Sequence, residues 1–180
     1  MKKALILTGN LVQDHEFIYP YYRLKEEGFE VITALKDGEK CKGILGTTIP
    51  SDKEAKIISY EAIEVEDFDI LVIPGGAKCM EKLRQEQRAL DVITEFNRLE
   101  KVIASICHGA QLLISAKVVK DRKVSGYYSI KDDITNAGAE YVDAPYVTDK
   151  NIISCPHYKY LGDWMKEIFR VYSEKNVKST

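Results

Sequence analysis

The chain has 180 residues, of which 45% are hydrophobic and 30% charged, and its formal net charge is -2. A chain of this length and composition can bury one core, and its nearly balanced charge argues against nucleic acid or an anionic membrane as a partner. Because no apolar run approaches the ~20 residues of a membrane span, we expect one globular domain over residues 1–180, located in the cytoplasm.

The predicted elements of the first half alternate between short apolar strands and amphipathic segments. In chain order they are a strand over 3–8, a helix over 17–27 that Gly28 ends, a strand over 30–34, a hairpin-like excursion over 38–50 and a strand over 69–73. This last strand stops at Pro74-Gly75-Gly76, a turn that needs backbone freedom.

The second half continues the alternation. In chain order it contains a predicted helix over 87–99, a strand over 102–106, helices over 109–116 and 130–137, a short hairpin over 146–154 and a helix over 161–177. Continuous apolar strands that alternate with helices are typical of parallel sheets covered on both faces. We therefore predict a single-domain α/β fold, a doubly wound, flavodoxin-like sandwich with a mostly parallel sheet and helices on both faces.

In such sheets, ligands bind beyond the carboxyl ends of the strands. Three loops meet that condition, at residues 9–16, at residues 74–81 and directly after residue 106. We expect these loops to lie together and to form the functional site.

The turn after residue 106 carries the strongest chemical signal. The apolar strand Val102–Ile106 runs directly into Cys107, His108 and Gly109 and then into a helix, which is the sequence form of a nucleophile elbow. On such an elbow the N–H of the following residue faces a developing oxyanion, and the helix N-terminus favours a thiolate. Cys107 is therefore the predicted nucleophile, with a buried structural cysteine as the alternative.

Three other side chains are candidates for acting with Cys107. His108 is adjacent, but neighbours on a tight turn tend to point apart, so a histidine that only fills the turn carries equal weight. Glu16 is expected at the same sheet edge, either as a proton carrier or only as a first-turn acid that complements its helix dipole. Glu81, beyond the Pro-Gly-Gly turn, has the same ambiguity.

The other cysteines and histidines give no metal signal. Cys41, Cys79 and Cys155 are scattered, with no C-x-x-C spacing, and are interpreted as reduced thiols. His15 and His157 are interpreted as loop residues. We expect no disulfide, no metal and no cofactor.

Taken together, the motifs resemble the ThiJ/PfpI family of the class I glutamine amidotransferase-like superfamily, above all its PfpI intracellular protease branch. The similarity covers nearly the whole chain. The segments that carry it are Glu16–Pro20, Arg23–Gly28, Ile73–Gly76, Ala104–Gly109 and Ala137–Asp143.

The resemblance implies a role for each candidate residue. Cys107 would be the nucleophile, Glu16 the acid hydrogen-bonded to it and His108 the histidine of a catalytic triad. Glu81 would complete that triad from a neighbouring subunit. The expected partner is therefore a second copy of the chain, in a dimer or an assembly of the hexamer-of-dimers type.

The resemblance also places further groups around the thiol. The backbone N–H groups of Gly76 and His108 would form the oxyanion hole, with Gly75 and Tyr127 near the site. At residues 154–158 the sequence Ser-Cys-Pro-His-Tyr replaces a more usual Ser-Arg-x-Pro, which brings an extra cysteine and histidine close to the site.

The family's known activities leave the reaction open. As a cysteine hydrolase acting on small carbonyl compounds or peptides, the protein would be a glyoxalase or protein deglycase that forms a hemithioacetal on Cys107, or a peptidase that forms an acyl-enzyme. The alternative is a non-catalytic stress protein that senses oxidation of an exposed, low-pKa Cys107 or acts as a chaperone. A glutaminase is disfavoured, because His157 is followed by Tyr158 and Lys159 rather than by a His-x-Glu pattern.

Overall fold

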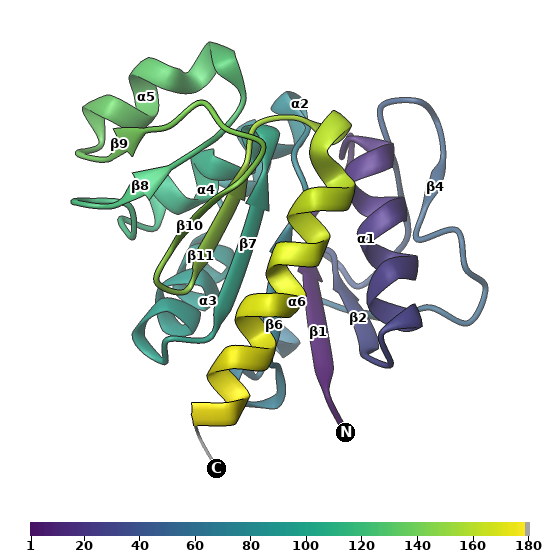
Figure 1. Ribbon diagram of the computed structural model, residues 1–180. Helices are drawn as coiled ribbons and strands as arrows, with labels where there is room; N and C mark the ends of the chain where they lie inside the picture. Colours follow the sequence, from purple (N-terminus) through teal and green to yellow (C-terminus); the bar gives the residue numbers. More distant parts are fainter. Residues whose placement is uncertain (179–180) are drawn as a thin grey trace.

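The computed structural model describes residues 1–178 and is built around a seven-stranded sheet (Figure 1). The strands lie in the order β10 (Val147–Asp149), β11 (Ile152–Cys155), β7 (Val102–Ile106), β6 (Ile70–Ile73), β1 (Lys3–Leu7), β2 (Glu30–Ala34) and β5 (Lys56–Ile58). Neighbouring strands pair in parallel except β10 and β11, which form the predicted hairpin. The predicted, mostly parallel sheet is confirmed.

Helices cover both faces of the sheet. Helices α1 (Asp14–Glu26) and α6 (Leu161–Lys178) lie side by side on the face turned toward the viewer in Figure 1, and α3 (Gln87–Arg98) and α4 (Ala110–Ser115) pack on the other face. The remaining α-helices of the described residues are α2 (Ala77–Leu83) and α5 (Lys131–Asn136). This arrangement confirms the predicted doubly wound α/β sandwich.

The central strands form the core. Every residue of β6 and β7 is buried, which explains why these strands read as continuous apolar runs. From the helix layer Phe17, Phe96 and Trp164 are also fully buried, and Trp164 donates its indole N–H to the carbonyl of Ile153. Burying each such side chain stabilises the fold by about 1.5–3 kcal/mol.

Two pairs of very short strands lie outside the main sheet. β3 (Cys41–Lys42) and β4 (Thr48–Ile49) pair antiparallel and confirm the predicted hairpin-like excursion. β8 (Lys123–Val124) and β9 (Glu140–Tyr141) pair in parallel and were not predicted. Strand β5 and helix α2 also lie where the sequence predicted only loop.

Helix α1 begins three residues before the predicted start. Its first turn carries Asp14 and Glu16, both buried. Asp14 accepts the backbone N–H groups of Leu45 at 2.8 Å and Thr47 at 3.2 Å, so the helix start is tied to the β3–β4 hairpin rather than to an N-terminal apolar residue. Among the described residues, no helix is both long and apolar enough to cross a membrane.

Candidate active site

The carboxyl ends of β1, β6 and β7 are neighbours in the sheet, so the three predicted loops meet at one edge. The backbone N–H of Gln13, in the first loop, donates to the carbonyl of Gly75 at 3.2 Å. The N–H of Gly75 in turn donates to Oε1 of Glu16 at 2.8 Å. The predicted meeting of these loops is confirmed.

The turn after β7 is a nucleophile elbow. Ile106 is still extended, whereas Cys107 has φ of 59°, in the left-handed region that side chains rarely adopt. A 3-10 turn over Cys107–Gly109 then leads into α4. A Cβ atom at Gly109 would lie 2.7 Å from the carbonyl oxygen of Ile73, so only glycine lets the elbow pack against β6.

Gly75 is the point of closest approach between the loops. A Cβ atom there would lie 2.5 Å from Oε1 of Glu16, 2.9 Å from the carbonyl oxygen of Ile106 and 3.0 Å from Cβ of Cys107. The lack of a side chain at Gly75 therefore allows the acid and the thiol to lie against the same stretch of backbone.

Glu16 is completely buried in the first turn of α1. Burial raises the pKa of this carboxyl to about 8, against the opposing effects of the Gly75 N–H and of its contact with the Cys107 thiol. Its Oε2 atom has no hydrogen-bond partner among the described residues. At neutral pH Glu16 is therefore mostly a neutral acid with one oxygen free to exchange a proton.

Cys107 is only 9% exposed. Burial raises the pKa of its thiol, the neighbouring Glu16 raises it further, and the backbone N–H of His108 lowers it. The thiol is therefore not exposed as expected, because the neighbouring segments cover it. Burial and the nearby Glu16 both disfavour its charged form.

The ring of His108 lies beside the thiol, with Nδ1 3.5 Å from Sγ of Cys107. Burial lowers the pKa of this imidazole, so it is neutral near pH 7 and can accept a proton. The ring stacks on Tyr127, with 4.9 Å between the ring centroids. Tyr127 also donates its backbone N–H to the carbonyl of Cys107 at 3.1 Å, so it lies near the thiol as the resemblance implied.

Sequence reasoning did not foresee that all three histidines of the chain lie in one row of rings. Beyond Tyr127 the row continues through His157, Tyr158 and His15, with centroid separations of 6.3, 4.2 and 4.9 Å. The three histidines come from three distant segments of the chain. Besides His108, only His157 had a signal in the sequence, the Ser-Cys-Pro-His-Tyr stretch at residues 154–158.

Two other predicted residues take different positions. Glu81 lies on the exposed side of α2, where it forms an ion pair with Lys78 at 3.2 Å. Within the chain it is therefore not among the groups gathered around the thiol. Gly76, with φ of 104°, accepts the N–H of Met80 through its carbonyl at the start of α2.

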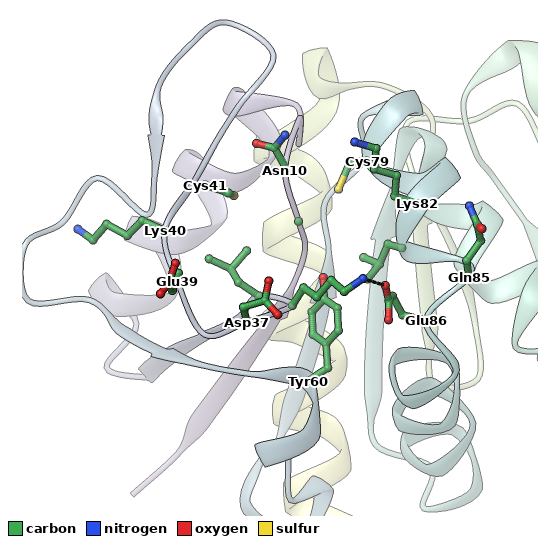
Figure 2. A pocket seen from close by; sticks show the side chains of 14 residues that line it. Asn10, Asp37, Glu39, Lys40, Cys41, Tyr60, Cys79, Lys82, Gln85 and Glu86 are labelled. Atoms are coloured by element: carbon green, nitrogen blue, oxygen red, sulfur yellow. Dashed lines mark ion pairs between the residues drawn. The ribbon is translucent and has the colours of Figure 1, made fainter.

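A cavity of about 440 Å³ lies apart from the thiol, between the segment after β2 and helix α2 (Figure 2). Cys41 and Cys79 line it, and the ion pair of Lys36 with Glu86, at 2.7 Å, joins the segment after β2 to the segment before α3. Its lining does not include Cys107. Within residues 1–178 no three His, Cys, Asp or Glu side chains are grouped to hold a metal ion.

Comparison with known proteins gives consistent matches. A model described as the DJ-1/PfpI family matches residues 2–171. Deglycase PH1704 of Pyrococcus horikoshii is 41% identical over 94% of this chain and 98% of its own length. The putative cysteine protease YraA of Bacillus subtilis is 33% identical over 85% of this chain and 88% of its own length. The crystal structure of Drosophila melanogaster DJ-1beta has the same fold, with a TM-score of 0.85, 23% identity and coverage of 99% of this chain and 95% of that one.

Proposed function

Because the chain belongs to the DJ-1/PfpI family, we propose that it is a cysteine-dependent enzyme acting on carbonyl groups, as a deglycase or glyoxalase, through a covalent intermediate on Cys107. Relatives named deglycases support an enzymatic role. The observation that carries the proposal is the buried Glu16, whose free Oε2 and raised pKa suit it to give and take protons beside the thiol.

The first step would be addition of the thiol to an aldehyde such as methylglyoxal or its adducts. A bond forms between Sγ of Cys107 and the carbonyl carbon, the thiol loses its proton and the carbonyl oxygen gains one. Glu16 and His108 are the two groups beside Sγ that can carry this proton. The backbone N–H groups of Gly76 and His108 would hold the oxygen while its charge develops.

With methylglyoxal, the resulting hemithioacetal would then rearrange. Transfer of a proton from the carbon bonded to sulfur to the neighbouring ketone carbon, together with transfer of the hydroxyl proton to the ketone oxygen, converts it into a thioester of lactate. Water cleaves the thioester, which releases lactate and restores the thiol. Glu16 is our candidate for that transfer, because a carboxyl with a pKa near 8 exists in both protonation states near neutral pH.

A peptidase is the second candidate, and one distance favours it. Nδ1 of the neutral His108 lies 3.5 Å from Sγ, as expected of a base for an attacking thiol. The third triad member of this reaction would be Glu81, which would have to reach the site from another copy of the chain. Because only 9% of Cys107 is exposed, the thiol suits small or exposed substrates better than a folded chain.

The proposal is tested with purified protein, methylglyoxal, a methylglyoxal-modified peptide and a panel of unmodified peptides. We expect turnover of the first two, and a loss of at least about 10³-fold in kcat for Cys107→Ser. Cys79→Ser is the matched control and should retain activity, because it changes a buried thiol that lines the cavity of Figure 2, apart from Cys107. If the wild type turns over none of these substrates and only suppresses aggregation of other proteins, the chaperone or sensor alternative is correct.

A further inference from the structure

A second thiol lies next to the elbow. Cys155 is the last residue of β11 and pairs in register with Ile106, the last residue of β7. Because Ile106 is extended, the Cα of Cys107 lies one residue further along the same strand direction. Strand spacing and residue rise then put the two cysteine Cα atoms about 6 Å apart, inside the range of disulfide bonds.

Cys155 is enclosed in a way that leaves it little else to react with. The residue is 0% exposed, and its thiol donates a hydrogen bond to the carbonyl oxygen of His157 at 3.4 Å. A charge on Cys155 raises the pKa of Cys107, and a charge on Glu16 raises the pKa of Cys155, so the three groups are close enough to interact. The other two cysteines line the separate cavity of Figure 2.

We propose that Cys155 is a resolving thiol for Cys107 and that the protein reduces hydroperoxides through a Cys107–Cys155 disulfide. This inference rests on the proposed role of Cys107 as nucleophile, but it adds a reaction that needs no carbonyl substrate. The 9% exposure of Cys107 against 0% for Cys155 sets the order, because only Cys107 can meet a peroxide from solution.

The chemistry balances in three steps. The sulfur of Cys107 attacks one peroxide oxygen, the O–O bond breaks, and Cys107 becomes a sulfenic acid while the other oxygen leaves as water or an alcohol. The Cys155 sulfur then bonds to the Cys107 sulfur, and the sulfenic hydroxyl leaves with the Cys155 proton as water. A small dithiol or an external protein dithiol returns the pair to two thiols and is itself oxidised to a disulfide.

Mass spectrometry after treatment with a single equivalent of hydrogen peroxide tests this proposal. In the wild type we expect loss of two hydrogens and a cross-linked peptide pair containing Cys107 and Cys155, both reversed by dithiothreitol. In Cys155→Ser we expect irreversible oxidation of Cys107 to the sulfinic acid to be at least about tenfold faster, because no thiol intercepts the sulfenic acid. Cys79→Ser should behave as the wild type.

Cys155→Ala serves as a second variant, since a fold defect specific to serine would not recur with alanine. Thermal melts of both variants check that they are folded. The proposal is overturned if the wild type gives no cross-linked pair and its Cys107 reaches the sulfinic acid as fast as in both variants. The readout of this experiment is the mass of the Cys107 peptides. It can therefore succeed or fail whether or not the protein turns over carbonyl substrates, so the two proposals are tested separately.

Discussion

Glu16 is an ionisable side chain in surroundings that disfavour its charge. The unfolded chain releases its proton near the ordinary value of 4.5, whereas the folded protein holds it to about 8. Between these values the native state binds the proton that the unfolded state has lost. The contribution of Glu16 to stability is therefore fully present below about pH 4.5 and is lost as pH rises through 8.

We predict that Glu16→Gln removes this pH dependence and most of the activity. Relative to the wild type, the free energy of unfolding of the variant should rise by up to about 1.4 kcal/mol per pH unit between pH 5 and 8. Urea denaturation at several pH values measures it. Turnover of methylglyoxal should fall about 10²–10⁴-fold, because the amide cannot carry a proton.

Glu61→Gln, at an exposed position, is the matched control for this prediction. It should follow the pH profile of the wild type in both stability and activity. A Glu16→Gln profile parallel to that of the wild type would mean that Glu16 ionises normally in the folded state, and the proton-carrier role would have to be abandoned.

The sequence predicted which residues gather at the site better than it predicted their protonation states. The motifs around Cys107, Glu16 and Gly75 are local, and the parallel fold brings the ends of adjacent strands together, so their meeting was predictable. The direction in which the pKa of Cys107 shifts was not predictable, because it depends on how completely neighbouring segments exclude water from the thiol. The row of rings was also not predictable from the sequence, since His15, His108 and His157 come together only through the tertiary fold.

At the scale of elements, the length of a segment explains most of what the sequence could reveal. Strands of four or five apolar residues and helices of twelve or more gave clear periodicity and were found where predicted. β5 has three residues, and β8 and β9 have two each, too few to separate a period from chance. Length does not explain α2, which has seven residues and was missed, whereas α4 and α5 have six each and were predicted. The early start of α1 escaped prediction because its first turn is polar and is fixed by a tertiary contact with the hairpin.

That contact gives a prediction for Asp14. Burial alone would raise the pKa of Asp14, but hydrogen bonds from the N–H groups of Leu45 and Thr47 hold it below its usual value. Asp14→Ala leaves both donors without their acceptor and should lower the free energy of unfolding by about 1–3 kcal/mol. Hydrogen exchange at the amides of Leu45 and Thr47 should accelerate.

Asp91→Ala is the comparison, because Asp91 is exposed on α3 and, within residues 1–178, accepts a hydrogen bond only from the side chain of Gln87. Its cost should stay below about 0.5 kcal/mol. Equal losses in the two variants, with unchanged exchange at Leu45, would show that Asp14 does not anchor the hairpin to α1.

For the whole molecule, the open question is whether one chain makes a complete site. A single chain supplies the thiol, Glu16 and His108, but its Glu81 points to solvent with 60% of its side chain exposed. If Glu81 acts in catalysis, it must act on a neighbour, so we expect native mass spectrometry to find a dimer or a larger assembly. In that assembly Glu81→Ala should lower activity without lowering the melting temperature by more than a few degrees, because an exposed side chain contributes little to stability.

Mixing variants separates a shared site from an indirect effect of Glu81. Cys107→Ser chains lack the thiol but keep Glu81, and Glu81→Ala chains have the opposite defect. Unfolding the two together in equal amounts and refolding them should restore about a quarter of the wild-type activity in a dimer, since half the dimers are mixed and each has one intact site. Activity no higher than the average of the two separate variants would place every catalytic group within one chain, and Glu81 would then be only a surface partner of Lys78.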